Sequence, residues 1–197
     1  MRGLGRRARH RGLTVTVQDR ERSVSPTATV SHGADKREIM AHLVLVTDVH
    51  APVERCFALS CDIDLHRRSM GASKERAIAG VTSGLIGPGQ QVTWQARHLG
   101  IWWRMTSKIV DYNRPWRFVD QMQRGPFVAW RHEHRFEQLP SSTRIIDIVD
   151  YRLPFGPLGR LADLLFVRCY LQRLLAARNR HIRLEAEHPE AAGEHPH

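Results

Sequence analysis

The 197-residue sequence has few cysteines and no long apolar segment. Its three cysteines, Cys56, Cys61 and Cys169, are too few and too scattered for a disulfide framework, and no CxxC pair is present. A reducing, cytoplasmic environment is therefore the simplest expectation. The apolar runs fall far short of the roughly 18 residues that a membrane-spanning helix needs, so no such helix is expected.

Motifs for phosphate binding and for acyl hydrolysis are also missing. The loop Gly84–Gly89 lacks the GxxxxGK[ST] pattern and joins two predicted strands, so it offers no helix N-terminus to an anion. The sequence contains no Gly-x-Ser-x-Gly element, which argues against a hydrolase of that type. No cofactor is expected.

Lysine is scarce: only three of the 30 basic residues are lysine, and the others are arginine. The net charge of +10 taken alone suggests a polyanionic partner. However, residues 1–40 carry +5, residues 41–184 carry +9 and residues 185–197 carry −4, and the central charges are spread along the chain rather than clustered. A solvated basic surface is the simpler interpretation. Nucleic-acid binding is not favoured, and peripheral contact with an anionic membrane stays open.

The two ends of the chain differ from its centre. Residues 1–39 lack aromatic side chains and any sustained period, so they are predicted not to pack. Met40 directly precedes the first convincing strand, which suggests that it is the natural start and that 1–39 is an upstream extension or a flexible basic leader. Residues 186–197 are predicted to be a flexible acidic tail. One domain is therefore expected over residues 40–185.

The central region predicts a strand, two short helices, six antiparallel strands and one long helix. Pro52 suits the first turn of the first helix, and Asp62 is a suitable cap for the second. The long helix, from Leu158 to about Glu185, would measure roughly 42 Å, with Leu164, Val167, Leu171, Leu174, Leu175 and Ile182 on its packed face. Strands are predicted at 41–50, 74–79, 91–99, 101–112, 115–124, 128–138 and 143–153. Tight turns link most of them, so an α+β fold with an antiparallel meander is expected.

This order of elements resembles the helix-grip fold of the START-like or SRPBCC superfamily, the polyketide cyclase/dehydrase and lipid-transport group. The likeness is greatest to small bacterial SRPBCC proteins and covers about residues 41–185. It rests on these residues as a set: Pro52–Phe57, Asp64–His66, Gly84 and Gly87–Gly89 before Val92 and Trp94, Pro115 with Phe118–Asp120, Gly125–Phe127, His132, His134, Phe136, Thr143, Asp147 and Pro154–Gly156. The resemblance implies a sheet curled round the long helix and an internal cavity for an apolar ligand. It supplies no catalytic residues, because the superfamily has no universal ones.

The period of two along the strands predicts which side chains face that cavity. The more apolar face of each strand is assigned inward, which also places Ile101, Trp116 and Val128 inside. His66, near the end of the second helix, lies either at the cavity mouth or on an exposed helix face. The predicted walls are Trp94, His98, Trp103, Met105, Phe118, Asp120, Trp130, His132, His134, Phe136, Asp147 and Tyr151.

Several of these inward residues are ionisable. Buried charges are costly unless paired, so hydrogen-bonded His/Asp pairs between neighbouring strands are predicted. Such pairs could fix strand register, orient the polar end of an apolar ligand, or act in acid–base catalysis. The catalytic candidates are Asp120, His132, His134, His98 and Asp147. His-x-His without a third close ligand is a weak metal signal, so no metal is assigned.

The sequence therefore predicts that the protein binds a hydrophobic small molecule or lipid, as a carrier or to sequester it, in a cavity between sheet and helix. The alternative is a polyketide cyclase, aromatase or dehydrase that uses the cavity Asp and His groups. Either a monomer or a homodimer is compatible with the sequence.

Overall fold

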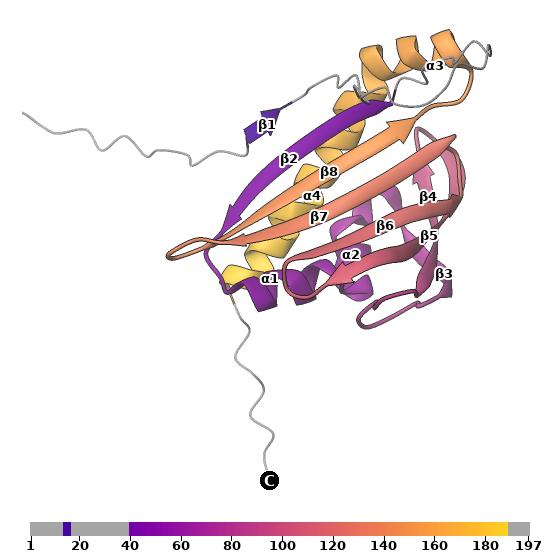
Figure 1. Ribbon diagram of the computed structural model, residues 1–197. Coiled ribbons are helices and arrows are strands. Elements are labelled where there is room, and N and C mark those ends of the chain that lie inside the picture. Colours follow the sequence, from indigo (N-terminus) through magenta and orange to yellow (C-terminus); the bar gives the residue numbers. More distant parts are fainter. Residues whose placement is uncertain (1–13, 17–39, 189–197) are drawn as a thin grey trace, which may run out of the picture.

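A curved antiparallel sheet forms most of the protein (Figure 1). The computed structural model describes residues 14–16 and 40–188, and all statements below concern those residues. The strands lie side by side in the order β1-β2-β8-β7-β6-β5-β4-β3. Their bounds are β1 Thr14–Thr16, β2 Ala41–Val49, β3 Arg76–Gly80, β4 Gln91–His98, β5 Ile101–Asn113, β6 Arg117–Arg124, β7 Ala129–Gln138 and β8 Thr143–Arg152.

Helices precede and follow the meander. They are α1 (Val53–Ser60), α2 (Ile63–Ser69), the short 3-10 helix η1 (Gly71–Ser73), α3 (Gly156–Ala162), the π-helical segment η2 (Asp163–Val167) and α4 (Arg168–Glu187). The Asp62 side chain accepts hydrogen bonds from the backbone N–H groups of Asp64 and Leu65, at 2.8 and 3.0 Å, so the predicted cap of α2 is confirmed. No helix in the described part of the chain is long and apolar enough to cross a membrane.

The predicted α+β architecture is confirmed. Strands β3 to β8 neighbour one another in sequence order, β2 closes the meander beside β8, and α4 crosses the concave face. One finding in the N-terminal segment was not expected: the β-branched run Thr14–Thr16 pairs with β2, with Val15 opposite Leu45. The other predictions for residues 1–39 and 189–197 lie outside the described residues.

The β4–β5 connection is a two-residue turn. His98 pairs with Ile101, and the intervening Leu99 and Gly100 have φ values of 52° and 84°. Two successive positive φ angles match the twist of the flanking strands, which is why a glycine is favoured here. The turn projects Leu99 into solvent.

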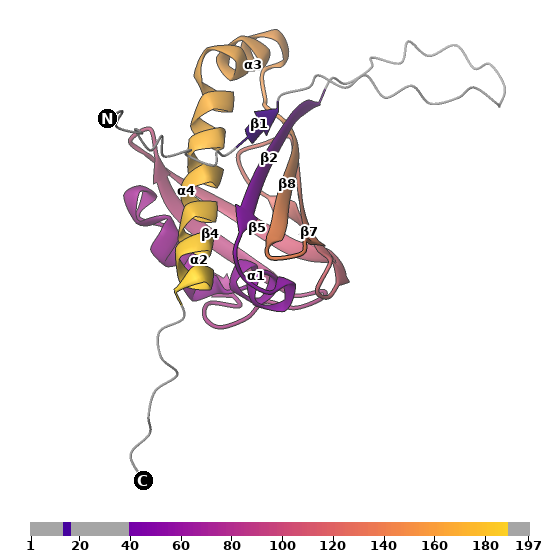
Figure 2. The same cartoon turned by 90° about the vertical axis from the view of Figure 1, so that its left-hand side faces the viewer.

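The C-terminal helix differs from the single helix that was predicted. It begins at Gly156, passes through η2, and bends there, so that α3 lies across one end of α4 (Figures 1 and 2). Leu164, predicted to pack, is exposed. Gly159 and Asp163 face inward instead, because a Cβ at 159 would lie 2.1 Å from the Pro154 carbonyl oxygen and because the Tyr151 hydroxyl donates to Asp163. Tight packing and a buried hydrogen bond therefore turn this helix so that its leucines face outward.

Two apolar clusters hold sheet and helices together. Phe57 of α1 makes edge contacts with Tyr112, Phe118 and Phe136 beneath one end of the sheet. At the other end, α4 packs on strands β2 and β8 through Leu171, Leu175, Leu43, Leu45, Val149 and Tyr151. Between the clusters, the concave face is not filled.

The candidate ligand cavity and its polar wall

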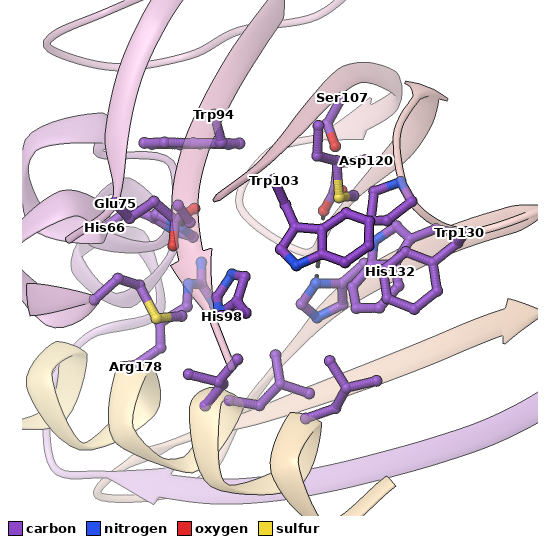
Figure 3. A pocket seen from close by; sticks show the side chains of 18 of the residues that line it. His66, Glu75, Trp94, His98, Trp103, Ser107, Asp120, Trp130, His132 and Arg178 are labelled. Carbon is purple, nitrogen blue, oxygen red and sulfur yellow. Dashed lines mark hydrogen bonds and ion pairs between the residues drawn. The ribbon is translucent and has the colours of Figure 1, made fainter. Parts of the chain in front are cut away.

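A cavity of about 510 Å³ lies between the concave face of the sheet and the helices α2, α3, η2 and α4 (Figure 3). Its walls are mostly apolar, and its volume falls within the roughly 300–1,000 Å³ typical of small-molecule sites. Ten of the thirteen side chains assigned to it from the sequence line it: His66, Trp94, His98, Trp103, Met105, Phe118, Asp120, Trp130, His132 and His134.

The other three assigned residues lie deeper. Phe136, Asp147 and Tyr151 are buried and do not line the cavity. Their inward direction follows from the strand period, but α1 covers Phe136 and the α3–α4 helix covers Tyr151. Three further residues were expected inside, but they lie at or beside strand ends and are about half exposed: Ile101, Trp116 and Val128.

An array of two histidines and two aspartates forms one wall. His132 and His134 lie two apart on β7, with ring centroids 3.8 Å apart. His132 Nε2 donates to Asp147 Oδ1 of β8 at 2.9 Å, and His134 Nε2 donates to Asp120 Oδ2 of β6 at 3.3 Å. The predicted His/Asp pairing between neighbouring strands is therefore confirmed. These two bonds run diagonally, because Asp120 is in register with His132 and Asp147 with His134. His134 Nδ1 also lies 2.8 Å from Asp147 Oδ1, directly opposite it.

Asp147 makes the most polar contacts of the four residues in this array and is fully buried. Besides the contacts with His132 Nε2 and His134 Nδ1, its carboxylate accepts a hydrogen bond from Asn179 Nδ2 at 2.5 Å and lies 3.6 Å from Arg178 Nη1. Burial alone would raise the pKa of Asp147, but hydrogen bonds and charge from His132 and His134 hold it well below its ordinary value. Asp147 is therefore ionised at neutral pH.

His132 and Asp120 present the array to the cavity. Burial lowers the pKa of His132, and the neighbouring His134 lowers it further, so His132 is neutral. Its single N–H is donated to Asp147, which leaves Nδ1 as a basic nitrogen 3.6 Å from Asp120 Oδ2. Burial would raise the pKa of Asp120, but the hydrogen bond from His134 and the nearby His132 and Arg178 lower it. The groups that His132 and Asp120 offer to the cavity, the imidazole Nδ1 and the carboxylate, are therefore both hydrogen-bond acceptors.

A second polar group lies at α2 and β4. His66 Nε2 is 3.2 Å from Glu75 Oε1, and its ring stacks on Trp94 with a centroid distance of 4.4 Å. His98 forms a 2.7 Å hydrogen bond with Tyr170 of α4 rather than with an aspartate. Burial lowers the pKa of His98, with Glu75 acting in the opposite direction. Of the two positions that the sequence left open, His66 therefore lies at the cavity.

Arg178 was missed by sequence reasoning. It is more than nine-tenths buried, lines the cavity, and donates from Nη2 to the Ser60 carbonyl at 2.9 Å. A usable signal was present, because residue 178 falls at helical spacing between Leu175 and Ile182 on the packed face of the helix. A charge on that face must be paired inside, and its partner is Asp147.

Asp120, His132 and His134 also have ligand atoms that all lie within 4.8 Å of one another, which is compatible with a metal ion. Binding an ion there would break the hydrogen bond between His134 and Asp120. The observed contacts therefore favour a hydrogen-bonded array.

Comparison with known proteins identifies the fold. No family model and no curated protein matches the sequence. Three solved structures match across most of their length: Zhui aromatase/cyclase from Streptomyces sp. R1128 (16% identity, TM-score 0.60, 78% of this chain and 97% of that one), a START superfamily protein from Mycobacterium smegmatis (14%, 0.57, 74% and 97%) and ginseng major latex-like protein 151 from Panax ginseng (14%, 0.54, 75% and 97%). The chain has the helix-grip fold of the START-like superfamily.

Proposed function

We propose that this protein binds a hydrophobic small molecule or lipid that carries a hydroxyl group at one end. The observation that supports this proposal is the cavity of about 510 Å³, whose lining is mostly apolar and whose ionisable groups are gathered at two places. At the β6–β7 wall, the Asp120 carboxylate and His132 Nδ1 can each accept a hydrogen bond from a ligand. These two acceptors would bind the hydroxyl group of an alcohol or phenol and would repel a carboxylate.

Retention of a ligand tests this proposal. Native mass spectrometry of the full chain purified from its own host should show one bound small molecule, and the emptied protein should bind the neutral fluorescent probe N-phenyl-1-naphthylamine. An identified molecule without a hydroxyl group would contradict the polar-end assignment. A chain that is empty and takes up no probe would contradict ligand binding altogether.

A second candidate function is the cyclisation or dehydration of a polyketide. It is favoured by the Asp147–His132 dyad, in which a buried carboxylate holds a neutral imidazole with its basic nitrogen toward an apolar cavity. His132 would take a proton from a methylene between two carbonyls. The resulting enolate would attack another carbonyl further along the polyketide chain, and the imidazolium would return the proton to the new alkoxide. The likeness to an aromatase/cyclase supports this candidate.

Turnover distinguishes the two candidates. If the protein is a cyclase, His132→Ala should slow the cyclisation of a linear poly-β-ketone by about 10²-fold or more, since general-base catalysis contributes at least that much. The variant should still bind N-phenyl-1-naphthylamine, because the apolar walls are unchanged. Equal product formation by the wild type, the variant and buffer would exclude the cyclase and leave ligand binding intact.

A further inference from the structure

Helix α3 and segment η2 line the cavity and turn most of their large apolar side chains outward. Among residues 156–167, only Gly159 and Asp163 are buried. Leu158, Leu164 and Leu165 are each two-thirds or more exposed. A surface helix of a globular protein normally shows the reverse pattern, and a large exposed apolar patch marks an interaction surface.

Two other segments that border the cavity also expose apolar side chains. The tip of the β4–β5 hairpin exposes Leu99, Ile101 and Trp102, and Val128 is exposed after the β6–β7 turn. All three segments border the same cavity, which Leu99, Phe127 and Phe166 line. We name segments 99–103, 126–128 and 153–167 together the apolar rim.

Arginines lie within the apolar rim and directly beside it. Segments 97–104, 124–128 and 153–168 contain five arginines: Arg97, Arg104, Arg124, Arg160 and Arg168. Their single acid, Asp163, is buried and bonded to Tyr151 and Arg168. These segments therefore expose no acidic side chain that could pair with arginines of a second copy of the chain.

We propose that the apolar rim is a docking surface for an anionic lipid bilayer. Leucines of α3 and η2 would enter the headgroup boundary, and the tryptophans of the hairpin suit that interface because indole has an apolar body and a polar N–H. Arginines near an anionic surface strengthen binding about fivefold each. A second copy of this chain fits less well, since two such faces would bring arginine against arginine. Docking requires only the rim and does not depend on what the cavity binds.

Vesicle binding by the full chain tests this inference. The chain should co-sediment with vesicles of phosphatidylcholine and phosphatidylglycerol, and binding should weaken at high salt and on pure phosphatidylcholine. Leu164→Asp combined with Leu165→Asp should lower the partition coefficient by about tenfold or more, because two exposed apolar side chains no longer insert. The matched control is Leu184→Asp, a half-exposed leucine near the far end of α4, which should bind as the wild type does.

Three results would overturn the inference. The first is the absence of binding to the anionic vesicles, and the second is equal binding by the double variant and the wild type. The third is a stable dimer in sedimentation velocity that the double variant dissociates, which would assign the rim to a second copy. Trp102→Ser on the hairpin gives an independent variant with the same expected loss should the double variant unfold.

Discussion

Asp147→Ala is expected to lower the free energy of unfolding by about 3–5 kcal/mol, the cost of removing one partner from a buried ion pair. The substitution leaves His132 without its acceptor, Asn179 without its 2.5 Å partner and Arg178 without its counter-charge, all in the interior. A cavity the size of a carboxylate adds to this loss. Urea unfolding followed by circular dichroism measures the change.

Asp150→Ala is the matched control for this prediction. Asp150 lies three residues further along β8, is partly exposed, and pairs with His42 at 2.6 Å. A partly exposed pair of this kind contributes about 1 kcal/mol or less. Equal small losses for both substitutions would show that the array does not stabilise the fold.

The pH dependence gives a second measurement of the same effect. The folded-state pKa of Asp147 is depressed, so its contribution to stability is present above the unfolded value of about 3.9 and is lost as pH falls below it. The wild type should therefore lose stability on acidification below about pH 4, and the Asp147→Ala variant should lack this component.

Ala96→Trp is expected to weaken N-phenyl-1-naphthylamine binding by at least about tenfold, or about 1.4 kcal/mol. Ala96 is buried on the inward face of β4 and lines the cavity opposite open space, so an indole there occupies volume that the probe needs. The fold should tolerate the change, because filling a cavity adds contacts without forcing the core apart. Fluorescence titration and a thermal melt of the same variant report the two effects.

Gln95→Trp controls for the indole itself. Gln95 precedes Ala96 on the same strand and does not line the cavity, so its side chain points to the other face. This variant should bind the probe as the wild type does. Unchanged affinity in Ala96→Trp would show that the probe sits outside the cavity.

The strand period predicted the direction of the site residues but not their depth. Alternation placed His132, His134 and Asp147 on inward faces, and all three point inward. It could not distinguish Asp147, which α4 covers, from His132, which lines the cavity. The depth of a side chain depends on which helix covers each stretch of the sheet. The same limit explains Phe136 and Tyr151, which α1 and the C-terminal helix cover.

The C-terminal helix shows a second limit of sequence reasoning. A helical repeat correctly placed Leu171, Leu175 and Ile182 in the core, since α4 is regular. The repeat failed at Leu164 because the π-helical segment changes the angle between successive residues, and because the close approach of Gly159 to Pro154 fixes the face of α3. Both causes are tertiary, so local spacing does not report them.

The pairing of Thr14–Thr16 with β2 has a consequence for association. β2 would otherwise be the edge strand of the sheet, with unpaired backbone N–H and C=O groups beside the apolar run Val44–Val46. Such an edge is a template for adding a strand from another molecule, which leads to aggregation. A chain that begins at Met40 would expose this template, so β1 covers the part of the edge strand that is most apolar.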